Sequence, residues 1–163
     1  IILARMGETE AGEIKEVDFS AFVEAAADDF ATVADQKGLR MEKEIEAGLM
    51  VKGAKDHLSE LINILCDNAV KYCDEEGLIK LGLGKRHYHR GILFEVSNSY
   101  AGGDQLDCSR LFERFYRGDT SHSSEKTGYG IGLAMAEGFV EECKGKIAAS
   151  YKEGMITISV IIP

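Results

Sequence analysis

The sequence predicts a two-layer α/β sandwich in which a mixed, mostly antiparallel sheet carries three longer helices on one face. Three segments repeat apolar residues at helical spacing, over roughly 19–37, 55–73 and 130–143. Other segments alternate apolar residues with polar or small ones, as half-buried strands joined by turns do. Because each helix and each strand has one apolar side, packing the helices on one face of the sheet buries both in a single core.

The first helical segment follows Asp18, a residue type that caps helix N-termini. Gly38 stands where a C-terminal cap belongs. The polar and acidic residues 7–15 are interpreted as a linker, and 1–6 as the last turns of a preceding dimerisation helix, so the domain is expected to cover 16–163. The expected apolar side of the first helix is Phe22, Ala25, Ala26 and Phe30.

The second helical segment has the clearest period. The predicted buried residues of this helix are Leu58, Leu61, Ile62, Leu65 and Ala69.

Shorter elements are expected between the main ones. Strands are expected at 39–45 and, shorter, at 49–51, and a short helix is expected at 109–116.

Two pairs of alternating segments predict β-hairpins. The first joins a strand around 79–83 to one around 92–98, and the second joins 145–151 to 155–162. In the last strand, the predicted buried residues are Ile156, Ile158, Val160 and Ile162.

The composition argues against several classes of function. The formal net charge of −9 disfavours a general nucleic-acid binder, which needs a basic face. No run approaches the roughly 18 apolar residues of a membrane span. The four cysteines form no C-x-x-C pair and are predicted to be reduced thiols. His87 and His89 have no further ligands at metal-site spacing and are expected on the surface.

One face of the second helical segment gathers three side chains that fit a magnesium nucleotide. Lys71 and Tyr72 follow Asn68 at i+3 and i+4, so all three can contact one ligand. An amide oxygen is a hard ligand that suits Mg²⁺, a lysine ammonium neutralises phosphate charge, and a tyrosine ring packs beside a nucleoside. The simpler interpretation is that Asn68 and Lys71 are merely solvated and that Tyr72 belongs to the core.

Asn98 continues the period of the strand before it and is therefore predicted to point inward. A buried amide must find hydrogen-bond partners, or it costs roughly 1–3 kcal/mol. Its oxygen can accept from an adenine amino group, although an amide can also rotate by half a turn and donate instead. The alternative is a turn residue that bonds to its own backbone.

Gly128, Gly130 and Gly132 alternate at the start of the third helical segment. Glycine allows the backbone angles and the close approach that a phosphate cradle needs, and a helix start stabilises anions. The polar residues 117–127 before it are predicted to form a mobile loop that can close over a nucleotide. The alternative is a flexible loop end that makes a tight helix–sheet contact.

These segments, in this order, resemble the four boxes of the catalytic, ATP-binding domain of bacterial sensor histidine kinases, in the GHKL superfamily with the Bergerat fold. The resemblance covers nearly the whole chain. Residues 65–72 resemble the N box, and 94–98, followed by Gly102, stand where the G1 box belongs. Residues 111–117 resemble the F box, and 128–133 the G2 box.

The resemblance implies ATP and Mg²⁺ as cofactors and suggests site residues. Asn68 would ligate Mg²⁺, while Lys71 and Tyr72 would line the phosphates and the nucleoside. Asn98 would stand where the family usually has its adenine-binding aspartate, with Gly102 after it. The segment that would hold the phosphates is Gly128, Tyr129, Gly130, Ile131, Gly132 and Leu133.

By the same resemblance, the F box would anchor a lid over 117–127, from which Arg117 or Lys126 would offset phosphate charge. The γ-phosphate would go to a histidine on the protein's own upstream dimerisation domain, since the family's acceptor motif is absent here. A response regulator would be a further partner. The full-length protein would be a homodimeric, membrane-anchored sensor, and this part a cytoplasmic, monomeric domain that touches neither nucleic acid nor membrane.

Two departures from the family pattern leave other interpretations open. The G1 box begins with Asn98 in place of aspartate and has Tyr100 in place of its first glycine. A degenerate nucleotide-sensing or partner-binding module is therefore a second hypothesis, and a phosphatase-biased or anti-sigma-type kinase a third. Ile64 stands where related ATP hydrolases carry a water-activating glutamate, which favours transfer to a histidine over hydrolysis.

Overall fold

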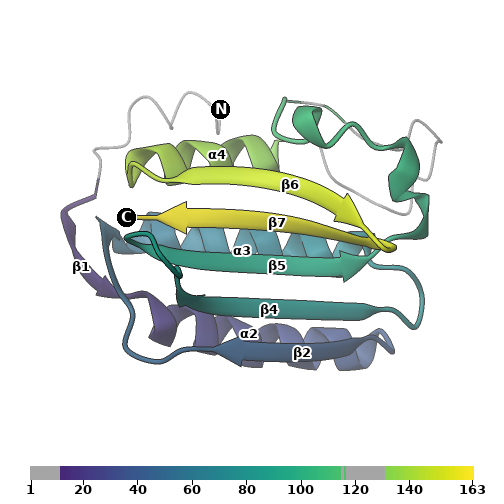
Figure 1. Ribbon diagram of the computed structural model, residues 1–163. Coiled ribbons are helices and arrows are strands. Elements are labelled where there is room, and N and C mark those ends of the chain that lie inside the picture. The colour runs from purple at the N-terminus through teal and green to yellow at the C-terminus, as the bar shows by residue number, and fades with distance from the viewer. Residues whose placement is uncertain (1–11, 115, 117–130) are drawn as a thin grey trace.

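The computed structural model describes residues 12–114, 116 and 131–163, and in it three helices lie behind one face of a five-stranded sheet (Figure 1). The sheet is mixed and mostly antiparallel, because β2 runs parallel to β4 and the other described pairs are antiparallel. The predicted two-layer fold is thereby confirmed. The helices are α2 (Phe19–Gln36), α3 (Lys55–Tyr72) and α4 (Gly132–Glu142). The strands, in spatial order, are β2 (Arg40–Ile45), β4 (Leu78–Lys85), β5 (Ile92–Ser99), β7 (Met155–Ile162) and β6 (Lys146–Lys152).

A second, two-stranded sheet lies at one end of the molecule. β1 (Ile14–Asp18) pairs antiparallel with β3 (Met50–Ala54), and the facing residues Val17 and Val51 are both buried. The interpretation of 7–15 as a linker is therefore wrong at its end, which already belongs to β1. Charged residues dominate this strand and only Val17 is buried, so the alternation that reveals other strands is missing.

The two ends of α2 follow the predicted caps. The side chain of Asp18 accepts a hydrogen bond from the backbone N–H of Ala21 at 3.0 Å. Gly38 lies just beyond the other end with a φ of +72°, a conformation in which glycine is not strained.

The buried side of α2 is only partly the predicted one: Ala26 is buried, and Phe22 and Phe30 pack against the edge of the core. Ala25 is exposed, and Phe22 and Phe30 are only half-buried. The buried stripe is rotated because Phe19 turns toward the sheet, where its ring meets that of Phe94 edge to face at 5.6 Å. The residues that α2 buries are Phe19, Ser20, Val23, Ala26, Ala27 and Ala34.

α3 lies across the middle of the sheet and packs against α2, α4 and β5. All five of its predicted core residues are buried, and Cys66 and Val70 are buried with them. Among the described helices, none combines the length and the apolar character that crossing a membrane requires.

Both predicted hairpins are present, β4 with β5 and β6 with β7. The four residues that the alternation assigned to the core in β7 are all buried. In β5, burial likewise falls on every second residue, from Ile92 to Asn98.

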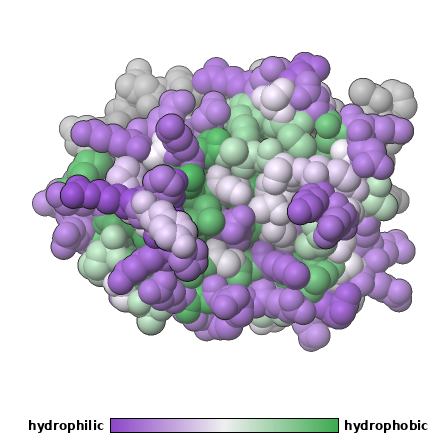
Figure 2. Space-filling model, viewed as in Figure 1, coloured by the Kyte–Doolittle hydropathy of each residue, from purple (hydrophilic) through white to green (hydrophobic). Residues whose placement is uncertain are grey.

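No described helix covers the opposite face of the five-stranded sheet, which Figure 2 shows with a pale centre and a hydrophilic rim. Side chains that point to this face include hydroxyls that pair across strands. The hydroxyl oxygens of Ser97 and Thr157 are 2.7 Å apart, and Ser159 donates to the carboxylate of Glu95 at 3.3 Å. Such pairs stabilise neighbouring strands on a face that water reaches.

Candidate functional site

The polar residues that the sequence singles out gather at the end of the molecule where α3 and β5 end and α4 begins (Figure 1). The end of α3 is tied to that of β5, since the N–H of Asp74 donates to the carbonyl of Ser99 at 2.9 Å. The start of α4 lies on α3, because a Cβ added at Gly132 would be 3.6 Å from Cγ2 of Ile64. The fold therefore assembles three segments that lie far apart in the sequence.

Asn68, Lys71 and Tyr72 lie on the last turns of α3 and are half-buried. The apolar residues around them fix the rotation of the helix, so this polar face lies at the edge of the core. The ammonium of Lys71 is 2.9 Å from the carboxylate of Asp67, one turn earlier. Both side chains are more than a third exposed, and such pairs contribute only about 0.3–0.5 kcal/mol. Lys71 can therefore exchange this carboxylate for a phosphate at little cost.

Asn98 is a buried strand residue, as its position in the alternation predicts. It is 3% exposed and is paired in the sheet with Ile79 and Ile156. Its Nδ2 donates to the carbonyl of Ser99 at 3.1 Å. Because the nitrogen end of the amide is bonded to the main chain, the oxygen end is the one that can accept from a ligand. The alternative, a turn residue that bonds to its own backbone, is correct only in part: Asn98 lies inside a paired strand, but its side chain does bond to the adjacent backbone carbonyl.

After β5 the chain enters the 3-10 helix η1 (Ala101–Gln105), which carries the glycines of the G1 segment. Gly102 is exposed, and a Cβ there would lie 3.8 Å from the ring of Tyr100, which is an ordinary contact. Gly103 is buried, and a Cβ there would lie 1.9 Å from the ring of Tyr151. The residue in this turn that must be glycine is therefore Gly103, which the sequence analysis missed.

The described part of the glycine-rich segment comprises Ile131, Gly132 and Leu133, all half-buried at the start of α4. The first N–H groups of a helix have no partner within it, and in the described structure Ile131 supplies no side-chain cap. Such a start suits an anion. Several predictions lie outside the described residues: the helix end at 1–6, the linker up to residue 11, the mobile loop 117–127 and the residues Arg117, Lys126, Gly128, Tyr129 and Gly130.

The described residues of the segment predicted as a short helix over 109–116 do not form an α-helix. The 3-10 turn η2 (Cys108–Arg110) comes first, and turns follow at 111–114, the described start of the F-box segment. The carboxylate of Asp107 accepts hydrogen bonds from the backbone N–H and the hydroxyl of Ser109. Asp107 thereby caps the start of η2, as Asp18 caps the start of α2.

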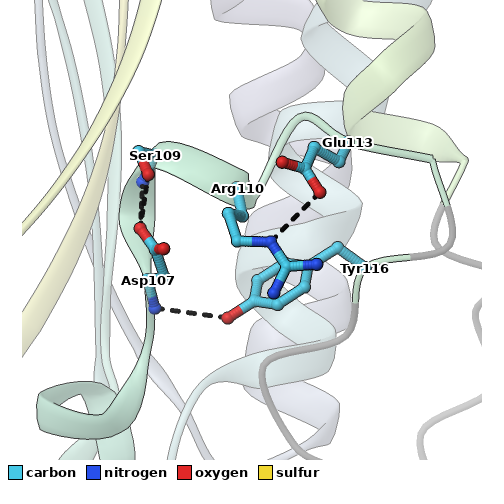
Figure 3. A network of polar contacts seen from close by, with 5 residues as sticks. All are labelled: Asp107, Ser109, Arg110, Glu113 and Tyr116. Carbon is cyan, nitrogen blue, oxygen red and sulfur yellow. Dashed lines mark hydrogen bonds and ion pairs between the residues drawn. The ribbon is translucent and has the colours of Figure 1, made fainter.

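A compact set of contacts closes this segment (Figure 3). The hydroxyl of Tyr116 accepts from the backbone N–H of Asp107 at 3.2 Å. The guanidinium of Arg110 lies over the ring of Tyr116, 4.5 Å from its centroid, and its Nε is 3.1 Å from the carboxylate of Glu113. Tyr116 is thereby held beside the start of η2.

Within the described part of the chain, no group of three or more His, Cys, Asp or Glu side chains is placed to hold a metal ion. The predicted metal ligand is the amide oxygen of Asn68, which is half-buried at the site. A Mg²⁺ ion held by one protein oxygen takes its other ligands from water and phosphate, and this is the usual manner in which Mg²⁺ binds with nucleotides. The donor set thus fits Mg²⁺ accompanied by a phosphate ligand.

Comparison with known proteins identifies the family. Residues 53–163 match the family model described as "Histidine kinase-, DNA gyrase B-, and HSP90-like ATPase". The signal transduction histidine-protein kinase BaeS of Escherichia coli K12 is 32% identical over 148 residues, which cover 90% of this chain and 31% of BaeS. The sensor protein CiaH of Streptococcus pneumoniae TIGR4 is 37% identical over 90 residues, 55% of this chain and 20% of CiaH. The chain thus spans about a third of BaeS and a fifth of CiaH.

Solved structures share the fold. A mycobacterial sensor histidine kinase, MprB, superimposes with a TM-score of 0.75 at 19% identity, covering 91% of this chain and 97% of that one. Full-length ShkA in complex with AMPPNP gives 0.76 at 22% identity, covering 98% of this chain and 33% of that one. These findings show that the chain belongs to the histidine kinase-, DNA gyrase B- and HSP90-like ATPases, and that it is similar to the catalytic parts of two-component sensor kinases.

Proposed function

We propose that this chain binds Mg-ATP and presents the γ-phosphate to a histidine on the dimerisation domain of the same two-component sensor, with a response regulator as the later partner. The buried amide of Asn98 supports this most directly. Its Nδ2 donates to the carbonyl of Ser99, which leaves the oxygen as the end that can accept from a ligand, and it lies at the end of β5, which is tied to the end of α3. ShkA, which is 22% identical to this chain in sequence, was solved in complex with AMPPNP.

Each residue of the proposed site has a role that follows from its chemistry. Asn98 accepts from the adenine amino group, and Tyr72 packs beside the nucleoside. Lys71 exchanges Asp67 for a phosphate, and Asn68 offers its oxygen to the metal ion. Mg²⁺, when bound, neutralises phosphate charge and orients the terminal phosphate. The protein's contribution is positioning and charge compensation.

The environment of Ile64 favours transfer to a histidine over hydrolysis. This side chain is half-buried against the start of α4 and carries no group that can activate water. A site that binds ATP without a base for water protects the γ-phosphate until an acceptor side chain arrives.

Calorimetry on this chain tests the proposal. We expect Mg-ATP to bind in the micromolar to millimolar range, about −4 to −8 kcal/mol. Asn68→Ala should remove the part of the affinity that depends on Mg²⁺, whereas Asn68→Asp, which keeps an oxygen donor, should retain some of it. The matched control is Asn63→Ala, an exposed position on the same helix, which should bind like the parent.

Two results would contradict the proposal. If the parent chain binds no nucleotide at millimolar concentration, the degenerate module suggested by Asn98 and Tyr100 becomes the better description. If Asn68→Ala binds Mg-ATP as the parent does, and phosphorylates normally in the longer protein, then Asn68 is not the metal ligand.

A further inference from the structure

The loop that follows α3 contacts the turn that follows β5 through a residue with no role in the proposed site. The carboxylate of Asp74 accepts a hydrogen bond from the backbone N–H of Ala101 at 2.8 Å, across 27 residues of sequence. The backbone N–H of Asp74 itself donates to the carbonyl of Ser99 at 2.9 Å. Asp74 therefore holds the turn on both sides of Tyr100.

The first of these bonds acts as a helix cap supplied from another element. Ala101 is the first residue of η1, and first-turn N–H groups need partners outside the helix. In the described structure Tyr100, at the N-cap position, provides no side-chain cap. Asp, Asn, Ser and Thr are the residues that usually cap helix starts, and here the aspartate comes from the end of α3.

The second bond reaches Asn98 through a shared acceptor. The carbonyl of Ser99 accepts from the N–H of Asp74 and also from Nδ2 of Asn98 at 3.1 Å. A carbonyl has two lone pairs, so it can hold both donors at once. The position of this carbonyl sets the orientation of the amide, and the loop after α3 fixes that position.

Other contacts hold the same turn from the β6–β7 hairpin. The N–H of Tyr100 donates to the carbonyl of Gly154 at 2.8 Å, and the ring of Tyr151 occupies the space beside Gly103. These contacts involve backbone or the sheet itself. The hydrogen bond to the Asp74 carboxylate, in contrast, can be removed by one substitution that leaves the strands intact.

We propose that Asp74 is a positioning residue of the nucleotide site, which sets the G1 turn and, through the Ser99 carbonyl, the accepting orientation of Asn98. The inference rests on the proposed function. It assigns to Asp74 an effect on nucleotide affinity and on the preference for adenine, and this effect acts through the turn and not through contact with the nucleotide.

The test compares three variants of this chain by calorimetry with Mg-ATP and Mg-GTP. Asp74→Ala removes the cap and should weaken Mg-ATP about three- to thirty-fold, in line with the usual effect of losing a cap, and should lower the ATP-to-GTP preference. Asp74→Asn keeps an acceptor oxygen and should stay within about three-fold of the parent. Asp29→Ala, which removes an exposed carboxylate of α2, is the matched control and should change neither value.

The sign of the effect separates positioning from charge. Removing a negative charge by itself favours an anionic nucleotide, so a loss of affinity in Asp74→Ala cannot be electrostatic. Hydrogen exchange without nucleotide gives a second readout: the Ala101 amide should exchange faster in Asp74→Ala and at the parent rate in Asp74→Asn.

The possible failures are distinguishable. If the parent chain binds no nucleotide, the proposed function fails and this role fails with it. If the parent binds but Asp74→Ala keeps the parent's affinity and preference, only the positioning role is overturned. Equal losses in Asp74→Ala and Asp74→Asn would also overturn it, because the capping oxygen would then be irrelevant.

Discussion

At the scale of single residues, the orientation of the buried Asn98 amide supports the proposed contact with adenine. Rotating the Asn98 amide by half a turn would bring Oδ1 against the carbonyl oxygen of Ser99, at the 3.1 Å where Nδ2 now donates. Two facing acceptors repel, so the main chain holds the amide in its accepting orientation. Asparagine here is thus able to act as a fixed acceptor despite the loss of the aspartate charge.

This orientation predicts the nucleotide preference. ATP carries an amino group where GTP carries a carbonyl, so GTP would leave two acceptors unpaired at a cost of roughly 1–3 kcal/mol. We expect competition binding to show about a five- to hundred-fold preference for ATP. Asn98→Leu should nearly abolish binding, while Ser97→Ala, on the opposite face of the same strand, should not. Equal affinity of the leucine variant would remove Asn98 from the adenine site.

The inward direction of Asn98 could be predicted from sequence, whereas its partners could not. A period of two is a local property, and it holds wherever a strand has one buried face. The contacts of Asp74 with Ser99 and Ala101 depend on how two distant chain segments close on each other. The same is true of Gly103, whose need for glycine arises from the ring of Tyr151.

At the scale of elements, long apolar periods predict helices and strands reliably, whereas short polar segments do so only in part: β2 matches the strand predicted at 39–45, but other short segments differ. α3 and the two hairpins match their predicted ranges because many apolar residues repeat in each. β1 was missed because a single buried residue cannot reveal a period. The helix predicted over 109–116 is wrong: Asp107 caps only the 3-10 turn η2, and eight residues, little more than two helical turns, are too few to reveal a period.

The element η1 offers a matched pair of substitutions. Gly103→Ala would drive a methyl group into the ring of Tyr151, and overpacking of this kind costs about 1–3 kcal/mol. Gly102→Ala, one residue earlier, meets its nearest atom at 3.8 Å and should leave stability nearly unchanged. Urea unfolding of the two variants measures the difference. Equal midpoints would show that Tyr151 moves aside freely.

At the scale of the whole molecule, a buried thiol should make the fold sensitive to alkali. Burial, with a smaller contribution from the charge of Asp67, raises the pKa of Cys66 to about 12 from 9.0. The raised pKa means that the folded state keeps the proton where the unfolded state has lost it. Stability is therefore fully retained below pH 9 and falls as the pH rises toward 12, by up to about 1.4 kcal/mol per pH unit.

Unfolding of the parent chain and of Cys66→Ala between pH 8 and about 11 checks this expectation. The alanine variant should be less stable at pH 8 because it leaves a cavity, but its stability should decline less steeply with pH. Identical slopes would show that another group, such as Cys143, whose pKa is raised by burial to about 11, accounts for the alkaline loss.

The parallel pairing of β2 with β4 has a consequence for how the chain can be divided. The family pattern begins at residue 53, after β1, α2 and β2. A chain cut there would turn β4 into an open edge with a row of unpaired N–H and C=O groups, and would uncover the side of α3 on which α2 packs. Open edges of this kind recruit other strands and lead to aggregation. Residues 14–45 therefore cover the edge of β4 and one side of α3. In this way they keep the part of the chain that matches the family from aggregating with other copies of itself.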